Sequence, residues 1–229
     1  MTPPDRAPAG IRHRRVTSAA GPADLWWHIA PHGPPLPGRA LLRHAVAAQQ
    51  ARPPDTVTVV RDRLGRPALA PEQNLPPLRL TAAHSGPVTV AALIATPCGG
   101  TRIGIDVEHL TSLPPPVLLH YALHPDERAA LTDRPATARK GDFLALWTAK
   151  EAIAKALGWP LPRALVDVEV ALYPRPALVR LGHDPAPLGW QLLPLSLPGT
   201  PHTITLAVHH HPPRSPRRES AWTSPAGPH

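Results

Sequence analysis

The chain has 229 residues, 42% of them hydrophobic, which is enough for one domain or for two small packed halves. No run approaches eighteen apolar residues and the basic N-terminus lacks an apolar stretch, so we expect neither a membrane-spanning helix nor a secretory signal. The lone cysteine, Cys98, cannot form an internal disulfide. These features predict a cytoplasmic protein, and we expect it to act as a monomer away from membranes.

The formal net charge of +8 is concentrated at the two ends of the chain. Residues 1–20 carry +3 and residues 210–229 carry +2, which leaves +3 for the middle. Such a modest excess suits a small anionic ligand or an acidic protein partner as well as nucleic acid. Aromatic residues make up only 4% of the chain and no nucleic-acid-binding motif is recognisable, so we expect no nucleic-acid partner.

Thirty-five prolines cluster at the ends and between the predicted elements. Proline-rich polar ends bury too little surface to order themselves, which predicts disordered tails at 1–22 and 210–229. Between the tails we place two halves, 23–105 and 106–209. Each shows strands around a helix, which suggests a pseudo-twofold relation without any repeated sequence.

The first half is predicted to contain five strands, one helix and a turn, from the periodicity of its apolar residues. They are, in chain order, a strand at 24–30, a helix at 38–51, a strand at 56–62, a turn at 64–70, paired strands at 79–86 and 88–95, and a strand at 101–108.

The second half begins with helical sequence at 115–132, in which Pro125 starts a second helix. The clearest helix of the chain is 141–158, with Asp142 placed to cap its start and Gly158 its end. Four strands follow, at 166–174, 178–182, 189–199 and 202–210. Strands and helices that mix without strict alternation indicate an α+β fold.

Two carboxylates stand on one face of the strand in "IGIDVE", because side chains alternate along a strand and Asp106 and Glu108 are two residues apart. Anionic side chains this close repel and need hydration, a partner or a bridging cation. Hard oxygen ligands at this spacing suit Mg²⁺. The alternative is an ordinary solvent-facing strand.

The helix in "FLALWTAKEAIAKALG" places Trp147, Glu151 and Lys155 on one stripe, four residues apart. An exposed Glu–Lys pair is the simple interpretation and contributes only about 0.3–0.5 kcal/mol. The functional interpretation makes Glu151 a third metal ligand or a base, and Lys155 a cation that binds phosphate.

Other candidates carry weaker signals. His84 and Ser85 end a strand before a glycine turn, but the chain has no G-x-S-x-G sequence to support a hydrolase. Arg39 and Arg43 lie one turn apart on a predicted helix, and Arg66 follows a turn. Each arginine alone is typical of a solvated surface, whereas together their guanidinium groups suit phosphates.

The two blocks together resemble the signature of the 4′-phosphopantetheinyl transferases, G-[IV]-D-x-E followed by [FW]-x-x-[LI]-W-[ST]-x-K-E-[SA]-x-x-K. The matching positions are Gly104, Asp106, Glu108, Phe143, Trp147, Thr148, Lys150, Glu151, Ala152 and Lys155. The resemblance covers roughly residues 24–208 and favours the larger, surfactin-synthetase-activating type.

The resemblance implies a pseudo-twofold α+β fold with coenzyme A in a cleft between the halves. It implies Mg²⁺-dependent transfer of the phosphopantetheine arm of coenzyme A to a serine of an apo acyl or peptidyl carrier protein, with release of adenosine 3′,5′-bisphosphate. Asp106, Glu108 and Glu151 would hold Mg²⁺, and Glu151 would also serve as the base, directly or through water. Lys155 and His84 would contact the pyrophosphate. The 3′-phosphate and its neighbours would be contacted by Arg39, Arg43 and Arg66.

Two departures from the family pattern keep an alternative open. A segment that is usually an arginine-rich helix reads "PHGPPLPG" here, and Ala83 replaces the usual serine before His84. The alternative is a catalytically weak or inactive member that binds coenzyme A or carrier proteins.

Overall fold

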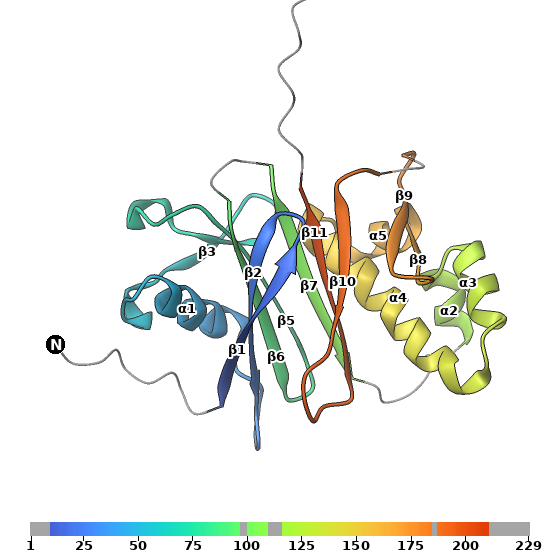
Figure 1. The fold of residues 1–229 in the computed structure, drawn as a ribbon, viewed down its shortest axis with the longest axis horizontal. Helices are drawn as coiled ribbons and strands as arrows, with labels where there is room; N and C mark the ends of the chain where they lie inside the picture. Colours follow the sequence, from blue (N-terminus) through green and yellow to red (C-terminus); the bar gives the residue numbers. More distant parts are fainter. Residues whose placement is uncertain (1–9, 97–99, 110–115, 185–186, 211–229) are drawn as a thin grey trace, which may run out of the picture.

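The computed structural model describes residues 10–96, 100–109, 116–184 and 187–210, and these form four layers (Figure 1). Two antiparallel sheets face each other, one long helix covers the outer face of the second sheet, and a shorter helix covers the outer face of the first. The expected α+β class is confirmed. The pseudo-twofold relation between the halves stays a prediction.

The first sheet has the strand order β1-β2-β6-β5, with each pair antiparallel. Its strands are β1 Ile11–Ser18, β2 Gly21–Ile29, β6 Val88–Ala95 and β5 Leu78–Ser85. Helix α1, Gly38–Gln49, packs its buried stripe of Leu41, Leu42, Ala45 and Val46 against the outer face of this sheet. The small ribbon of β3 Val59–Arg61 and β4 Pro67–Leu69 lies beside α1, between the short helices η1 Pro54–Thr56 and η2 Pro71–Gln73.

The second sheet has the order β10-β11-β7, also antiparallel. Its strands are β10 Trp190–Leu195, β11 His202–His209 and β7 Arg102–His109. Helix α4, Ala136–Leu157, covers its outer face, and the remaining elements pack on the far side of α4. These are α2 Pro116–Ala122, α3 Pro125–Thr132, α5 Leu161–Asp167, β8 Val168–Ala171 and β9 Ala177–Leu181.

The sheets meet along β5 and β7. The central core between them contains the alternate side chains Ile103, Ile105 and Val107 of β7, which pack with apolar residues of β2, β6 and β11. Two bonds tie the strands together: Ile105 N donates to Thr81 Oγ1 at 3.0 Å, and Arg79 Nε donates to Thr101 O at 2.9 Å. Since alternate residues of β7 face away from this core, Asp106 faces α4.

Gly104 allows β7 and α4 to approach each other closely. A Cβ atom built at this position would lie 1.9 Å from Ala152 O and 2.6 Å from Ala156 N, both on the backbone of α4. No side chain fits in that space, because neither backbone atom can move aside alone. The glycine of the "GIDVE" block therefore sets the distance between the strand and the helix that carry the carboxylates.

Most expected elements are present, and several details need correction. The expected disordered tail 1–22 is wrong for Ile11–Ser18, which pairs with β2 as an edge strand. The boundary at 105/106 falls inside β7, which belongs wholly to the second sheet. The expected tail 210–229 lies outside the described residues except for His210, and Cys98 lies outside them as well.

Helix α4 begins five residues before its expected start, after Pro135, so Asp142 does not cap it. Asp142 instead accepts bonds from Arg134 Nε at 2.9 Å and Tyr173 Oη at 2.7 Å. Gly158 ends α4 in the left-handed conformation, as expected. Within the described residues, no helix has both the length and the apolar character needed to cross a bilayer.

Candidate active site

Three carboxylates converge where β7 faces α4. One oxygen from each of Asp106, Glu108 and Glu151 can be chosen so that all three lie within 4.8 Å of one another. Asp106 and Glu108 come from β7 and Glu151 from the middle of α4. The structure thus brings together all three predicted metal ligands.

Lys155 lies one turn beyond Glu151 and reaches two of these carboxylates. Its Nζ donates to Asp106 Oδ1 at 2.5 Å and lies 3.5 Å from Glu151 Oε2. Burial raises the pKa of Asp106 to about 7; the positive charge of Lys155 opposes this shift, and the negative charges of Glu151 and Glu108 add to it. The cluster therefore has an excess of negative charge that one lysine does not neutralise.

The donors present fit a divalent cation. Asp106 Oδ2 is buried and has no hydrogen-bond partner in the part of the chain that the structure describes. An orphaned, buried carboxylate oxygen is costly unless an ion or water satisfies it. The cluster offers only carboxylate oxygens, which are the hard ligands that Mg²⁺ prefers.

The pKa shift of Asp106 predicts how metal-free protein responds to pH. Its folded-state pKa lies above the unfolded value, so the protonated form favours folding, and stability is lost as pH rises toward 7. With a chelator present, the free energy of unfolding of Asp106→Asn should rise relative to that of wild type by about 2–3 kcal/mol as the pH is raised from 5 to 8. Urea unfolding at the two pH values measures this difference, and an equal difference at both would show that Asp106 is ionised throughout.

A cavity of about 370 Å³ lies in the first half of the chain. Its walls come from the start of α1, the β3–β4 ribbon and the end of β5. Arg39 and His84, both predicted as cofactor-binding residues, line it, together with Arg61. Arg61 was missed, because a lone arginine in an alternating strand gives no sequence signal. His84 precedes Ser85, whose Oγ donates to Glu108 Oε2 at 2.9 Å, so the end of β5 carries both a cavity residue and a partner of the cluster.

The other predicted arginines have partners of their own. Arg43 lines a neighbouring hollow with Arg39, and its Nε donates to Pro54 O at 3.1 Å. Arg66 does not line the cavity. It forms an ion pair with Asp62 at 2.8 Å and donates to Ala156 O at 3.1 Å, at the C-terminal end of α4. Such a cation at a helix C-terminus satisfies carbonyls that the helix leaves free.

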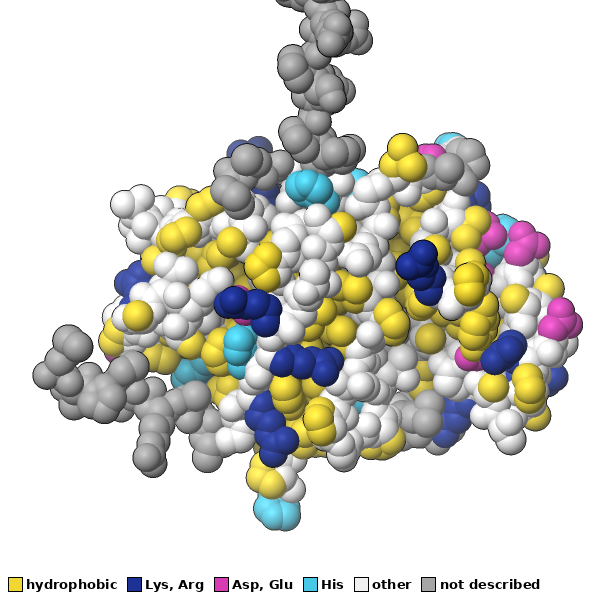
Figure 2. All heavy atoms as spheres, viewed as in Figure 1, with side chains coloured by type: hydrophobic (Ala, Val, Ile, Leu, Met, Phe, Trp, Pro, Cys, Tyr) yellow, Lys and Arg dark blue, Asp and Glu magenta, His cyan; other side chains and the backbone are white. Residues whose placement is uncertain are grey.

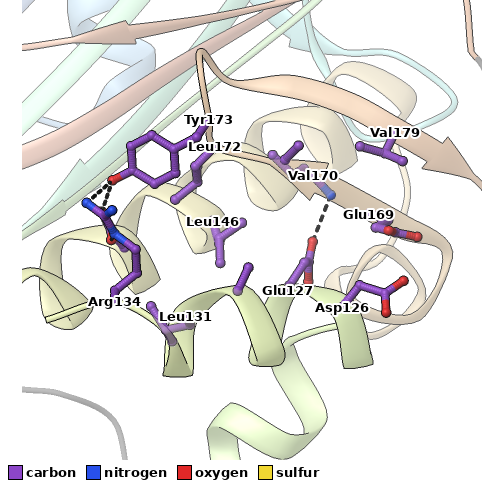
Figure 3. Close-up of a pocket in the computed structure, with 13 residues that line it drawn as sticks. Asp126, Glu127, Leu131, Arg134, Leu146, Glu169, Val170, Leu172, Tyr173 and Val179 are labelled. Carbon is purple, nitrogen blue, oxygen red and sulfur yellow. Dashed lines mark hydrogen bonds and ion pairs between the residues drawn. The ribbon is translucent and has the colours of Figure 1, made fainter. Parts of the chain in front are cut away.

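Lys150 of the "WTAKE" block has a structural role that the sequence did not suggest. Its side chain is fully buried, with Nζ 2.6 Å from Glu127 Oε2, and it also donates to Ala122 O and Leu165 O. Glu127 in turn accepts from His124 N at 2.7 Å. It also accepts from Val170 N at 2.8 Å (Figure 3). The pair joins α3, α4 and β8 beneath an apolar pocket of about 280 Å³. Burial raises the pKa of Glu127 and lowers that of Lys150, and each partner opposes the other's shift.

Removing one member of this buried pair should be costly. Lys150→Met leaves Glu127 without its counter-charge, so we expect a loss of about 3–5 kcal/mol in the free energy of unfolding. Arg15→Met, which removes an exposed partner of Asp24, should cost less than about 1 kcal/mol. Urea unfolding of both variants gives the comparison, and equal small losses would contradict the role assigned to Lys150.

A second group of metal-ligand type, His124, Asp126 and Glu169, lies at the rim of the same pocket. Its polar atoms are engaged in other bonds. His124 Nδ1 accepts from Asp126 N as the N-cap of α3, and Glu169 pairs with Arg180 at 3.2 Å. Helix capping and an ion pair therefore account for this group.

The fold and the site define an α+β protein with a three-carboxylate cluster and an arginine-lined cavity, linked through the end of β5. Residues 102–207 match the family model described as ACPS, the 4'-phosphopantetheinyl transferase superfamily. A solved structure of Thermotoga maritima holo-[acyl-carrier-protein] synthase is 21% identical, with a TM-score of 0.38 over 47% of this chain. The match spans 62% of that protein's length. Comparison with curated proteins gave no match.

Proposed function

We propose that this protein transfers the 4′-phosphopantetheine arm of coenzyme A to a serine of an apo carrier protein. The observation that supports this best is the convergence of Asp106, Glu108 and Glu151 within the segment that matches the superfamily model. A solvent-facing strand would leave these carboxylates apart, and Asp106 is only 3% exposed.

The carrier serine oxygen attacks the phosphorus that bears the pantetheine arm. A new P–O bond forms to the serine, and the bond to the leaving adenosine 3′,5′-bisphosphate breaks. Glu151 takes the serine proton, directly or through one water, because its side chain is more exposed than that of Asp106. When bound by the three carboxylates, Mg²⁺ would neutralise charge on the diphosphate. Lys155 brings a fixed positive charge to the same place.

Coenzyme A would lie with its nucleotide phosphates in the 370 Å³ cavity. Arg39, Arg61 and His84 line it and suit anionic oxygens. Arg43 supplies a further cation in the adjoining hollow. We assign Arg66 to a supporting role, since its guanidinium already binds Asp62 and the end of α4. Arg39 and Arg61 in the cavity and Arg43 in the adjoining hollow offset the missing basic segment.

One chain supplies both parts of this site, which favours the larger, surfactin-synthetase-activating type acting as a monomer. The cavity belongs to the first half and the carboxylates to the second. Carrier proteins are typically acidic near the modified serine, and Figure 2 shows a row of basic side chains over the region of β1 and β2. Arg12, Arg14 and Arg15 of β1 contribute to the charge of the folded body. A cytoplasmic location agrees with this chemistry.

The proposal is tested by intact mass spectrometry. The protein is incubated with coenzyme A, Mg²⁺ and either an apo acyl carrier protein or an apo peptidyl carrier domain, each accepted by a control enzyme. We expect the carrier to gain the mass of one phosphopantetheine group, and the gain to disappear with a chelator. Coenzyme A binding without any transfer would support the inactive-binder alternative. Neither binding nor transfer would overturn the proposal.

A further inference from the structure

We propose that Ser85 is a positioning residue that holds Glu108 in place as a metal ligand, an inference that rests on the proposed function. Ser85 ends β5, on the first sheet, whereas Glu108 lies on β7, on the second. Ser85 Oγ donates to Glu108 Oε2 at 2.9 Å. The bond therefore crosses between the two halves at the candidate metal centre.

A second bond fixes the direction in which the hydroxyl donates. His109 N donates to Ser85 Oγ at 3.2 Å. A serine hydroxyl has one proton and two acceptor sites, so accepting from the backbone of residue 109 leaves its proton for Glu108. The serine is thus anchored to the strand it orients, at the residue next to the carboxylate.

The orientation of the Glu108 carboxylate depends on the bond from Ser85, whereas the other two carboxylates of the cluster are held by Lys155. Lys155 pairs with Asp106 and Glu151, whereas Ser85 is the hydrogen-bond donor that the described part of the chain provides to the Glu108 carboxylate. The side chain of Glu108 is half-buried, so solvent is within reach. Repulsion from the other two carboxylates favours its rotation outward. The Ser85 bond opposes that rotation before any cation arrives.

The same residue couples the two parts of the site. His84, its neighbour in β5, lines the cavity, so a single strand end presents one side chain to the cavity and the next to the metal ligand. A metal held by Glu108 is thereby fixed relative to the phosphates that the cavity would bind. Supporting residues of this kind typically change metal affinity 10–100-fold when removed.

The test measures Mn²⁺ affinity from the electron paramagnetic resonance signal of free Mn²⁺, with the full chain and coenzyme A present. Ser85→Ala should weaken Mn²⁺ binding by about 10–100-fold, and Ser85→Thr, which keeps the hydroxyl, should restore most of it. Ser18→Ala is the matched control, because it removes a hydroxyl that bonds Gly21 O in the β1–β2 turn, and it should leave affinity unchanged.

A double-mutant cycle separates positioning from general damage. In a Glu108→Gln background, Ser85→Ala should have little further effect, since the ligand it orients is already lost. If wild type binds Mn²⁺ and Ser85→Ala binds it equally well, or if the two changes add fully, the inference is overturned and the proposed function stands. If wild type neither binds Mn²⁺ nor modifies a carrier protein, both the role of Ser85 and the proposed function are contradicted.

Discussion

Replacing Glu151 by glutamine is expected to lower the rate of phosphopantetheine transfer by about 100- to 1000-fold, while leaving the fold intact. Glu151 is the one carboxylate of the cluster that comes from α4, and it lies within ion-pair distance of Lys155. The amide keeps the shape of the side chain but loses its charge, its basicity and much of its affinity for Mg²⁺. Losses of this size follow when one preorganised electrostatic group is removed from a site.

The Mg²⁺ dependence of the residual rate distinguishes the two roles of Glu151. A higher Mg²⁺ requirement identifies it as a ligand, whereas an unchanged requirement with a lower maximal rate identifies it as the base alone. The matched control is Glu72→Gln, which changes an exposed glutamate of η2 and should leave the rate unchanged. Retention of more than about a tenth of the activity by Glu151→Gln would contradict both roles.

Gly104→Ala is expected to destabilise the protein by about 3 kcal/mol or more and to abolish transfer. The new methyl group would overlap the backbone of Ala152 and Ala156, so β7 must move away from α4. Overpacking against backbone exceeds the 1–3 kcal/mol typical of side-chain crowding. The movement also separates Asp106 from Glu151 and Lys155. Urea unfolding and the carrier-modification assay measure the two effects.

Gly141→Ala provides a control of opposite sign. Gly141 lies inside α4 with nothing within 4 Å of an added Cβ. Alanine has the higher helix propensity, so this change should stabilise the protein by about 0.5–1 kcal/mol and leave transfer unchanged. A Gly104→Ala protein as stable and active as wild type would show that the strand and helix are not in close contact.

The carboxylate cluster could be predicted because it rests on short-range regularities. Alternation places Asp106 and Glu108 on one face of β7, and helical spacing places Lys155 one turn from Glu151. The convergence of the strand with the helix was implied by the resemblance alone. Local spacing does not determine which helix crosses which strand.

The roles that the sequence did not predict depend on partners that are distant in the sequence. Lys150 pairs with Glu127 across 23 positions of chain, and nothing in the helical stripe distinguishes a buried lysine from an exposed one. Asp142 was expected to cap α4, but it bonds Arg134 and Tyr173. The short helix α5, at Leu161–Asp167, gave too little periodicity to be separated from the following strand.

The composition of the edge strand β1 is the reason that it was not predicted as a strand. Its sequence is rich in arginine and follows a proline-rich stretch, which is typical of a disordered tail. Pairing with β2 along its whole length overrides that tendency, and charged residues are the usual protection of an edge strand. The basic charge assigned to a tail therefore lies partly on the folded body.

Whether Asp106, Glu108 and Glu151 hold one ion together is tested most directly by crystals grown with Mn²⁺ and coenzyme A. Anomalous diffraction should show a single strong Mn²⁺ peak within coordination distance of one oxygen of each carboxylate. A peak located elsewhere, or a structure in which Glu151 turns away from Asp106 and Glu108 with the ion bound, would contradict the account.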